Sequence, residues 1–566
     1  MGDTEFAPLS SRIADLVHAY FDGLPKRSKP IVRDDGTAEW IPMTGIVLVK
    51  GENTPSETLT CVAVTTGAKC LPASQILNCN GLVLHDCHAE ILAVRAFNFW
   101  LLSECRAFFQ REKDIQTDRE SNQSGNEGSS RPISDSDERS SPYIRRRQKL
   151  EPVEDAITPP LEIQPDVSIY MYCTCAPCGD ASMELLMAEQ DDPTPWTIPE
   201  TDPNTTAETI SALSGRGHFS RLGVVRRKPA RADAESTKSK SCSDKLALRQ
   251  VSSLLSHGAS LLVAPTENVY VKGLVMPEEE ISKVGIQRCF GRDGRMKSLS
   301  GQRWSASGPD HNDNEASKSG QNGGREESDG PCRFLYEYHP FDVLSIPNTQ
   351  LASLWPFRKP KASDPASAED ATAQFKKRKP GTISAVWVRA PTETSQSKSP
   401  SSTAAAPIDN GAKNLPVLRG SKTGLFESVV NGVRQGHKAS APGLRGASAL
   451  SRARLHQAWT ESYLAGSKDS LQAKPKSSSN EDETNELWGA GAKTAKNAST
   501  YREFKNGKTD NVARRRAIQA AKEVLGDWVP NEGDEDWGWD ATAGEFGLVD
   551  ARGQPIGDPK ANKRKR

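Results

Sequence analysis

The segment that decides the fold spans residues 84–91 and reads LHDCHAEI. It leads into a mostly apolar run from Cys87 to about Phe108, and the spacing of its apolar residues predicts a long, buried helix. At the start of this helix a single residue separates His88 from Glu90. A lone His-x-Glu is common in proteins, so this segment indicates a functional site only in combination with other segments of the chain.

Two further segments place a cysteine at the start of a predicted helix. Residues 167–172 are predicted as a strand, and Pro177-Cys178-Gly179 follows where that strand turns into a helix. The segment Ser241-Cys242-Ser243-Asp244 opens another helix. Helix N-termini suit thiolates, because the helix dipole and the free N–H groups stabilise negative sulfur.

Together the three segments predict a zinc site with His88, Cys178 and Cys242 as ligands. Zinc binds imidazole nitrogen and thiolate sulfur, and a catalytic site leaves the fourth position to water. The ion lowers the pKa of that water to about 7, and Glu90 is placed to move a proton without binding the metal. His-x-Glu followed by Pro-Cys is the signature of nucleobase deaminases, in which the glutamate is the general acid and base.

Alternatives stay open at this stage. The common signature ends in Pro-Cys-x-x-Cys, but Ala181 stands three residues after Cys178, so the third ligand must come from elsewhere and Cys242 is the candidate. Cys175 and Cys178 have the spacing of a redox pair, although no thioredoxin-like surroundings are apparent. His85 is a weaker ligand candidate, because it precedes the helix and lacks the paired glutamate.

Composition indicates one α/β catalytic domain interrupted by polar insertions. The chain has 566 residues, of which 36% are hydrophobic, and its mean hydropathy is −0.61. These values are low for a chain that is folded throughout. Long polar segments bury too little apolar surface to fold, so we expect them to interrupt the domain as insertions. Strands are predicted at 45–49, 61–64, 167–172, 261–263, 269–271 and 383–388. We expect the domain to span residues 10–530, with disordered insertions at 111–160, 189–210, 299–330, 357–380, 390–418 and 465–495 and a disordered, acidic then basic tail at 531–566.

Charge and cysteine content indicate which partners and which cellular compartment to expect for the protein. The 73 basic and 73 acidic residues cancel, so bulk charge gives no argument for nucleic acid, and RNA contacts would need a local basic patch. The eleven cysteines do not have the spacing of a disulfide framework in a secreted protein. The sequence also has no apolar signal segment and no stretch that could span a membrane, so it predicts an intracellular protein. The basic end, residues 563–566, fits a nuclear signal or a plain tail, so nucleus and cytoplasm both stay open.

Residues 84–91, 176–183 and 241–245 resemble the three motifs of the eukaryotic RNA adenosine deaminase domain. This domain occurs in double-stranded-RNA editing enzymes and in the tRNA-specific deaminase that converts A37 of tRNA-Ala to inosine. The resemblance implies a cytidine-deaminase-like mixed sheet flanked by helices. It also implies hydrolytic attack at C6 of adenosine, with Glu90 delivering a proton to the departing ammonia. Unstacking the target base costs little in an anticodon loop.

Two features favour the tRNA branch of this family. The catalytic segment begins near residue 10, which leaves no room ahead of it for the RNA-binding domains of the editing enzymes, and residues 177–183 lean toward the tRNA enzymes. We therefore expect tRNA as the substrate, most specifically A37 of tRNA-Ala, and no obligate protein partner. An editor of structured RNA and a catalytically dead RNA-binding module stay as alternatives, and the intact Glu90 argues against the second.

The family also buries inositol hexakisphosphate, which needs Lys and Arg donors. The resemblance implies these ligands: Arg95, Lys245, Tyr501, Lys505 and Trp528, with Lys496 weaker. Val94 and Leu248 stand where the editing enzymes have arginine, which implies fewer contacts or a neighbour such as Arg249.

Residues near the substrate follow from the same resemblance and from charge. Lys69 aligns with a family residue near the edited nucleotide. The basic segment 226–231 offers Arg227, Lys228 and Arg231 to RNA phosphates, although a solvated loop is nearly as good an interpretation.

Overall fold

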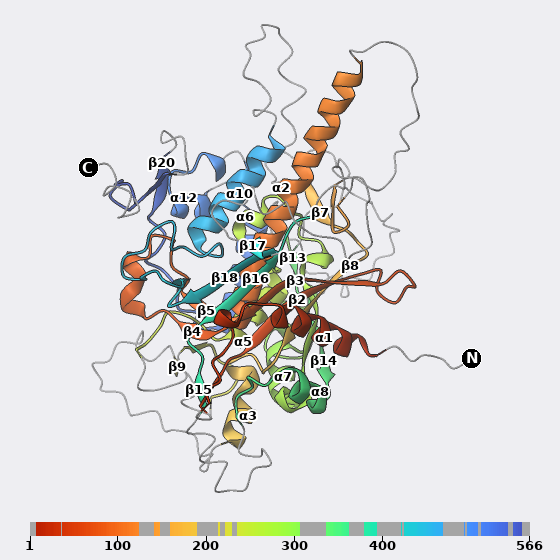
Figure 1. Ribbon diagram of the computed structural model, residues 1–566, viewed down its shortest axis with the longest axis vertical. Coiled ribbons are helices and arrows are strands. Elements are labelled where there is room, and N and C mark those ends of the chain that lie inside the picture. Colours follow the sequence, from red (N-terminus) through yellow and green to blue (C-terminus); the bar gives the residue numbers. More distant parts are fainter. Residues whose placement is uncertain are drawn as a thin grey trace, which may run out of the picture.

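The computed structural model (Figure 1) describes most of the chain. The described residues are 7–34, 37–123, 141–147, 159–189, 213–214, 221–228, 235–305, 336–360, 378–392, 420–421, 424–467, 492, 495–507, 511–540 and 547–556. Arg231 and much of the predicted insertions lie outside them. Within these ranges, none of the helices combines the length and the apolar character that crossing a membrane requires.

A mixed sheet of nine strands forms the centre of the fold, as the sequence predicts (Figure 1). Its first three strands are parallel and the others pair antiparallel. In spatial order the strands are β14 (Asp342–Ile346), β11 (Val271–Pro277), β8 (Val167–Cys173), β2 (Met43–Lys50), β3 (Thr58–Thr66), β16 (Ser384–Arg389), β18 (Gly424–Val430) and β17 (Gly420–Ser421), with β19 (Val433–Arg434) beside β18.

Helices cover both faces of the sheet, because side chains alternate along each strand. On β2, Ile46 and Leu48 join the large core that contains α2 (Ala89–Gln123). Val47 and Val49 point the other way, into a second core with α1 (Leu9–Asp22). β2 is therefore buried on both sides.

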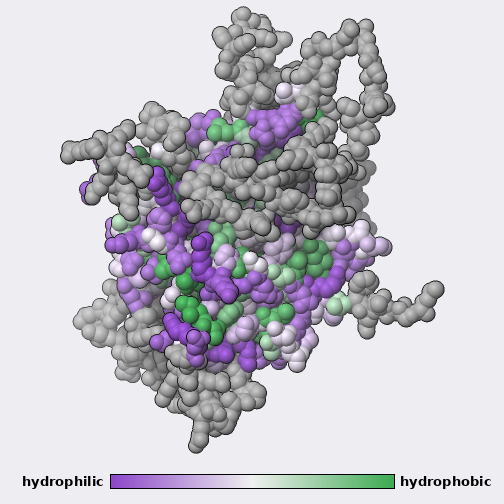
Figure 2. All heavy atoms as spheres, viewed as in Figure 1, coloured by the Kyte–Doolittle hydropathy of each residue, from purple (hydrophilic) through white to green (hydrophobic). Residues whose placement is uncertain are grey.

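The remaining elements are short. The helices are α3 (Met183–Ala188), α5 (Cys242–Ser252), α6 (His257–Ser260), α7 (Lys283–Phe290), α8 (Asn348–Leu354), α10 (Arg452–Gly466), α12 (Tyr501–Asn506) and α13 (Val512–Leu525), and the 3-10 helices are η1 (Lys26–Ser28), η2 (Ala73–Asn78), η4 (Asp180–Ser182), η5 (Glu267–Val269), η6 (Glu278–Glu280) and η7 (Lys297–Leu299). The strand pairs are β1 (Ala38–Trp40) with β15 (Arg378–Pro380), β4 (Ala68–Cys70) with β5 (Asp86–His88), β6 (Ile144–Arg146) with β7 (Leu161–Ile163), β9 (Leu213–Ser214) with β10 (Arg226–Arg227), β12 (Arg303–Trp304) with β13 (Tyr336–Glu337), and β20 (Gly538–Asp540) with β21 (Gly547–Val549). On the face that Figure 2 shows, the hydrophobic patches are small and lie between hydrophilic ones.

The structure corrects several predicted boundaries. α2 does not end near Phe108 but continues to Gln123, into the predicted insertion 111–160, which also contains β6. These segments support each other through two hydrogen bonds, of 2.7 and 2.6 Å, from Arg146 to the Glu112 carboxylate. β12 and β15 likewise lie inside the predicted insertions 299–330 and 357–380.

Two other predictions differ from the structure. Residues 261–263 form a turn with one isolated bridge, from Val263 to Leu161, instead of a strand. The supposedly disordered tail contains the β20–β21 hairpin. Trp537 at its start is 1% exposed and stacks on Tyr501 of α12 at 4.7 Å between ring centroids. Aromatic packing therefore orders this part of the tail.

Candidate metal centre and active site

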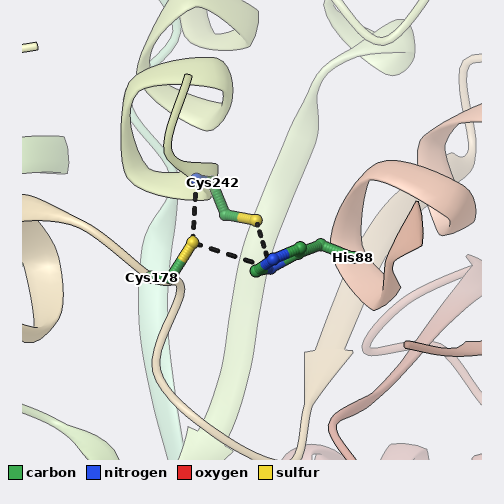
Figure 3. A group of neighbouring side chains, drawn as sticks. All are labelled: His88, Cys178 and Cys242. Atoms are coloured by element: carbon green, nitrogen blue, oxygen red, sulfur yellow. Dashed lines mark hydrogen bonds between the residues drawn. The ribbon is translucent and has the colours of Figure 1, made fainter. Parts of the chain in front are cut away.

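His88, Cys178 and Cys242 meet at one point, although they come from three separate elements (Figure 3). His88 ends β5, Cys178 lies in the loop between β8 and η4, and Cys242 is the first residue of α5. Each cysteine Sγ lies 3.6 Å from His88 Nδ1, and all three candidate ligand atoms lie within 4.8 Å of one another. Imidazole and thiolate donors at this spacing fit a zinc ion.

The N-terminus of α5 is tied to the loop that carries Cys178. The backbone N–H of Cys242 donates to Cys178 Sγ at 3.4 Å, and Ser243 Oγ donates to the Cys178 carbonyl at 3.0 Å. Gly179 makes this approach possible: its φ is +108°, and a Cβ atom there would lie 2.3 Å from Ser241 Oγ. A glycine is therefore required directly after Cys178.

Glu90 occupies the first turn of α2, beside this group, and is 3% exposed. It lines a cavity of about 560 Å³ together with His88 and Cys178. Its Oε2 has no hydrogen-bond partner among the described residues. Burial raises the pKa of Glu90, and the nearby Cys178 thiolate raises it further. A buried carboxyl that is open toward a cavity is suited to hold and transfer a proton.

A buried charge network surrounds Asp86, two residues before His88. Its carboxylate accepts hydrogen bonds from Lys228 Nζ at 2.9 Å, Ser239 Oγ at 2.8 Å and Lys245 Nζ. Burial acts to raise the pKa of Asp86, but the two ammonium groups outweigh it and hold the pKa well below its usual range. Lys228 Nζ also lies 3.3 Å from Cys242 Sγ, so its charge stabilises a thiolate there.

This network corrects the prediction for Lys228. Its side chain lines the same cavity as Lys69 and Arg227, but it is 5% exposed and its ammonium group is paired with Asp86, so Asp86 and not a phosphate is its partner in this structure. Lys69 and Arg227 line the cavity, as their predicted role near the substrate requires, and Lys69 is exposed. Arg226, in the same basic segment, is fully buried.

A second cavity, of about 250 Å³, lies on the other side of Asp86. Of the five ligands predicted for inositol hexakisphosphate, Arg95 and Lys245 line it, as do Val94 and Leu248. Tyr501, Lys505 and Trp528 do not line it. Tyr501 is nonetheless close enough to Arg95 to affect its pKa.

The other two predicted ligands and Lys496 are engaged elsewhere. Lys505 pairs with Glu535 at 2.7 Å, Trp528 lies under Lys240 Nζ, and the exposed Lys496 lies over the Tyr463 ring.

Near the second cavity lie Arg249, which the sequence analysis named as a possible substitute, and two cations that it missed, Arg452 and Arg514. Arg249 and Arg452 line it, and Arg514 of α13 is close enough to Arg249 to lower its pKa. Burial and then the charges of Arg514 and Arg95 lower the pKa of Arg249 to about 9. A signal existed for Arg514, because it shares a helix face with the buried Ala517 and Ala521.

The alternative ligands take other places. His85 Nε2 donates a hydrogen bond to Asp534 Oδ2 at 2.9 Å, and His85 lies in a separate buried group with Cys79. Cys175 lines the large cavity but is not part of the His88 group, and the cysteines of the described residues are free thiols. Cys242, not Cys175, is therefore the third member of the group.

A histidine and two cysteines at two helix starts, with a buried glutamate two residues after the histidine, form the arrangement used by the nucleobase deaminases. The family comparison agrees with this class: residues 63–128 and 148–320 match the adenosine-deaminase (editase) domain. Two segments of the chain, together less than half of its length, are therefore similar to this domain.

The most similar curated relatives include two named tRNA-specific adenosine deaminase 1. The one from Schizosaccharomyces pombe is 35% identical over 288 residues, which cover 51% of this chain and 62% of the relative. The one from Saccharomyces cerevisiae is 30% identical over 288 residues, covering 50% and 62%. A double-stranded RNA-specific editase B2 from Mus musculus is 26% identical over 177 residues, 31% of this chain and 17% of that protein. The chain thus spans less than two thirds of the length of these relatives.

Proposed function

We propose that this protein is a zinc-dependent deaminase that converts adenosine to inosine in tRNA. The observation that carries the proposal is the buried Glu90 carboxyl in the cavity beside His88 and Cys178, with an Oε2 atom that has no hydrogen-bond partner among the described residues. These three residues would hold zinc, whose chemistry is Lewis-acid activation of water. The roles of all four residues belong to the proposal.

The reaction is hydrolytic. Water adds at C6 of the adenine ring and ammonia leaves from the same carbon, so the products are inosine and ammonia. Glu90 takes a proton from the water and delivers it to the departing nitrogen. The low exposure of Glu90 keeps bulk water from competing for that proton.

The substrate assignment rests on the relatives. The two yeast relatives, 35% and 30% identical to this chain, are named for tRNA, whereas the editase matches a smaller part of this chain. The sequence resemblance narrows the proposed target to A37 of tRNA-Ala. The cavity is open to solvent at the exposed Lys69, where a phosphate of the anticodon loop would bind.

The direct test is incubation of the zinc-loaded protein with tRNA-Ala transcripts, followed by sequencing for inosine. We expect inosine at position 37. Folded, zinc-loaded protein that yields no inosine in tRNA would overturn the proposal, and preferential editing of long duplex RNA would favour the structured-RNA alternative.

Replacement of the proposed proton carrier sharpens this test. Glu90→Ala should lower turnover by at least about 100-fold, the usual contribution of a general acid–base, while zinc content stays unchanged because Glu90 is not a proposed ligand. Glu523→Ala is the matched control, since Glu523 is an exposed residue of α13. Equal turnover in both variants would contradict the role of Glu90.

We also propose that the second cavity binds inositol hexakisphosphate. Arg95, Lys245, Arg249 and Arg452 line it, and burial lowers the pKa of Arg95 to about 10, with repulsion from Arg452 adding to the effect. Buried cations that repel one another favour a polyanion that pairs with them. The test is the melting temperature of the protein with and without added inositol hexakisphosphate.

A further inference from the structure

The catalytic cavity reaches well beyond the group formed by His88, Cys178 and Cys242. Its lining includes Glu90 and also Trp40 of β1, Pro380 of β15 and Arg358, and we call the part lined by the last three residues the outer end. Its volume of about 560 Å³ lies within the range of roughly 300–1,000 Å³ typical of ligand sites. The outer end therefore offers room beside the target base.

Trp40 lines the outer end of this cavity without packing into a hydrophobic core of the described residues, which is unusual for a tryptophan. It is half-buried, ends β1 and lies opposite Pro380 of β15, which also lines the cavity. Within the described ranges, Trp40 belongs to none of the four hydrophobic clusters, whereas its neighbour Ile41 is 2% exposed in the cluster with α1. Tryptophan normally gains stability by burying its large ring, so this ring has surface left for a ligand.

Cations and carboxylates both line this cavity, and Lys359 is paired with Glu189 at 2.6 Å. Arg358 lines the cavity near Trp40, and its carbonyl accepts a hydrogen bond from Arg378 Nη1 at 3.2 Å. Lys69 and Arg227 line the cavity nearer the metal group. The cavity thus contains an aromatic ring and cationic side chains, the two kinds of group that bind single-stranded nucleic acid by stacking bases and by holding phosphates.

We propose that Trp40 is the stacking platform for the nucleotide next to the deaminated adenosine. The inference rests on the proposed function, because it takes the substrate to be RNA. A target base that enters the cavity loses its stacking on its neighbour, and the Trp40 ring replaces that lost partner. Trp40 is thus a positioning residue: it contributes to substrate binding and not to proton transfer.

The test compares Trp40→Ala and Trp40→Phe on an anticodon stem-loop RNA. We expect Trp40→Ala to raise KM by about 10- to 100-fold, the effect of losing one stacked base, with little change in kcat, and Trp40→Phe to restore most of the loss. Val284→Ala removes an exposed apolar side chain outside the cavity and should leave KM unchanged. A purely structural role for Trp40 would instead lower the melting temperature and kcat together.

RNA variants identify the stacked neighbour. An abasic site on one side of the target adenosine should raise the KM of the unsubstituted protein, and with that RNA Trp40→Ala should have no further effect. If the unsubstituted protein deaminates the RNA without an abasic site and Trp40→Ala has the same KM for that RNA, the platform is overturned while the proposed function stands.

A binding readout keeps the two proposals separable. With 2-aminopurine beside the target position, binding to the unsubstituted protein should quench the fluorescence, and binding to Trp40→Ala should not. This measurement decides about Trp40 even if no inosine forms, an outcome that would overturn the proposed function alone. Equal quenching by both proteins overturns the platform.

Discussion

At the residue scale, Gly179 sets the distance between the two cysteines. Gly179→Ala would place a Cβ atom at a φ of +108° and 2.3 Å from Ser241 Oγ. Backbone strain and the clash together should lower the free energy of unfolding by about 2–4 kcal/mol. The Cys178 loop must then move away from α5, so zinc content after purification should also fall.

A second glycine provides the matched control. Gly436 has a φ of +92°, but a Cβ atom there would meet nothing within 4 Å. Gly436→Ala therefore carries only the backbone cost of about 1 kcal/mol, with zinc content unchanged. Metal analysis and chemical denaturation of both variants check the prediction, and equal zinc content in the two would contradict it.

Sequence motifs predict single site residues only where the chemistry of the site constrains residues that are close together in the chain. His88 and Glu90 lie two positions apart, Cys178 lies in the loop just before η4 and Cys242 begins α5, so the short motifs are enough to predict them. Lys228 was misassigned, because its partner Asp86 lies 142 positions away. No local pattern distinguishes a lysine that pairs inside the protein from one that binds phosphate.

At the element scale, close packing of α1 on β2 depends on Gly45. A Cβ atom at Gly45 would lie 2.5 Å from Cγ2 of Val17. Gly45→Ala should therefore push α1 off the sheet and destabilise the protein by about 1–3 kcal/mol, the usual effect of overpacking. Val17→Ala in the same chain should restore part of that loss. Urea denaturation of the single and double variants measures the coupling, and additive losses would show that α1 does not meet the sheet at this point.

The periodicity of apolar residues predicts where the buried elements lie, but it does not predict how far an exposed element extends. The strands predicted at 45–49, 61–64, 167–172 and 383–388 form β2, β3, β8 and β16. The extension of α2 could not be predicted from its polar sequence, because contacts such as Arg146 with Glu112 join segments that are distant in the chain. Local polarity alone made them resemble an insertion.

At the scale of the whole molecule, the formal charge of +0 hides an uneven distribution. Cations from α2, α5, α10 and α13 gather around the second cavity: Arg95, Lys245, Arg249, Arg452 and Arg514. Composition could not reveal this cluster, because it is the fold that brings the helices together. From this cluster we expect the stability of the protein to depend on pH, and on an anion if the second cavity binds one as proposed.

Lys240, beside this cluster, allows the dependence to be tested. Burial, and then repulsion from Lys245, Lys522 and Arg227, lowers the pKa of Lys240 from 10.5 to about 7. Between pH 7 and 10.5 the unfolded chain holds the proton more firmly than the folded one, so this lysine makes stability rise with pH. From pH 7 to 9, the free energy of unfolding should increase by roughly 2 kcal/mol more in the unsubstituted protein than in Lys240→Met. Lys297→Met, at an exposed position, should show the unsubstituted behaviour.

A polyanion bound in the second cavity should raise the pKa of Lys240 again. Inositol hexakisphosphate favours the charged form of Lys240, so it should raise the melting temperature more at pH 7 than at pH 9, and the difference should be smaller in Lys240→Met. Subtracting the variant's values removes the titration of the ligand itself, because both proteins meet the same ligand charge. If the ligand raises the melting temperature of both proteins equally at both pH values, Lys240 is not linked to the anion site. If it raises neither, the second cavity does not bind it.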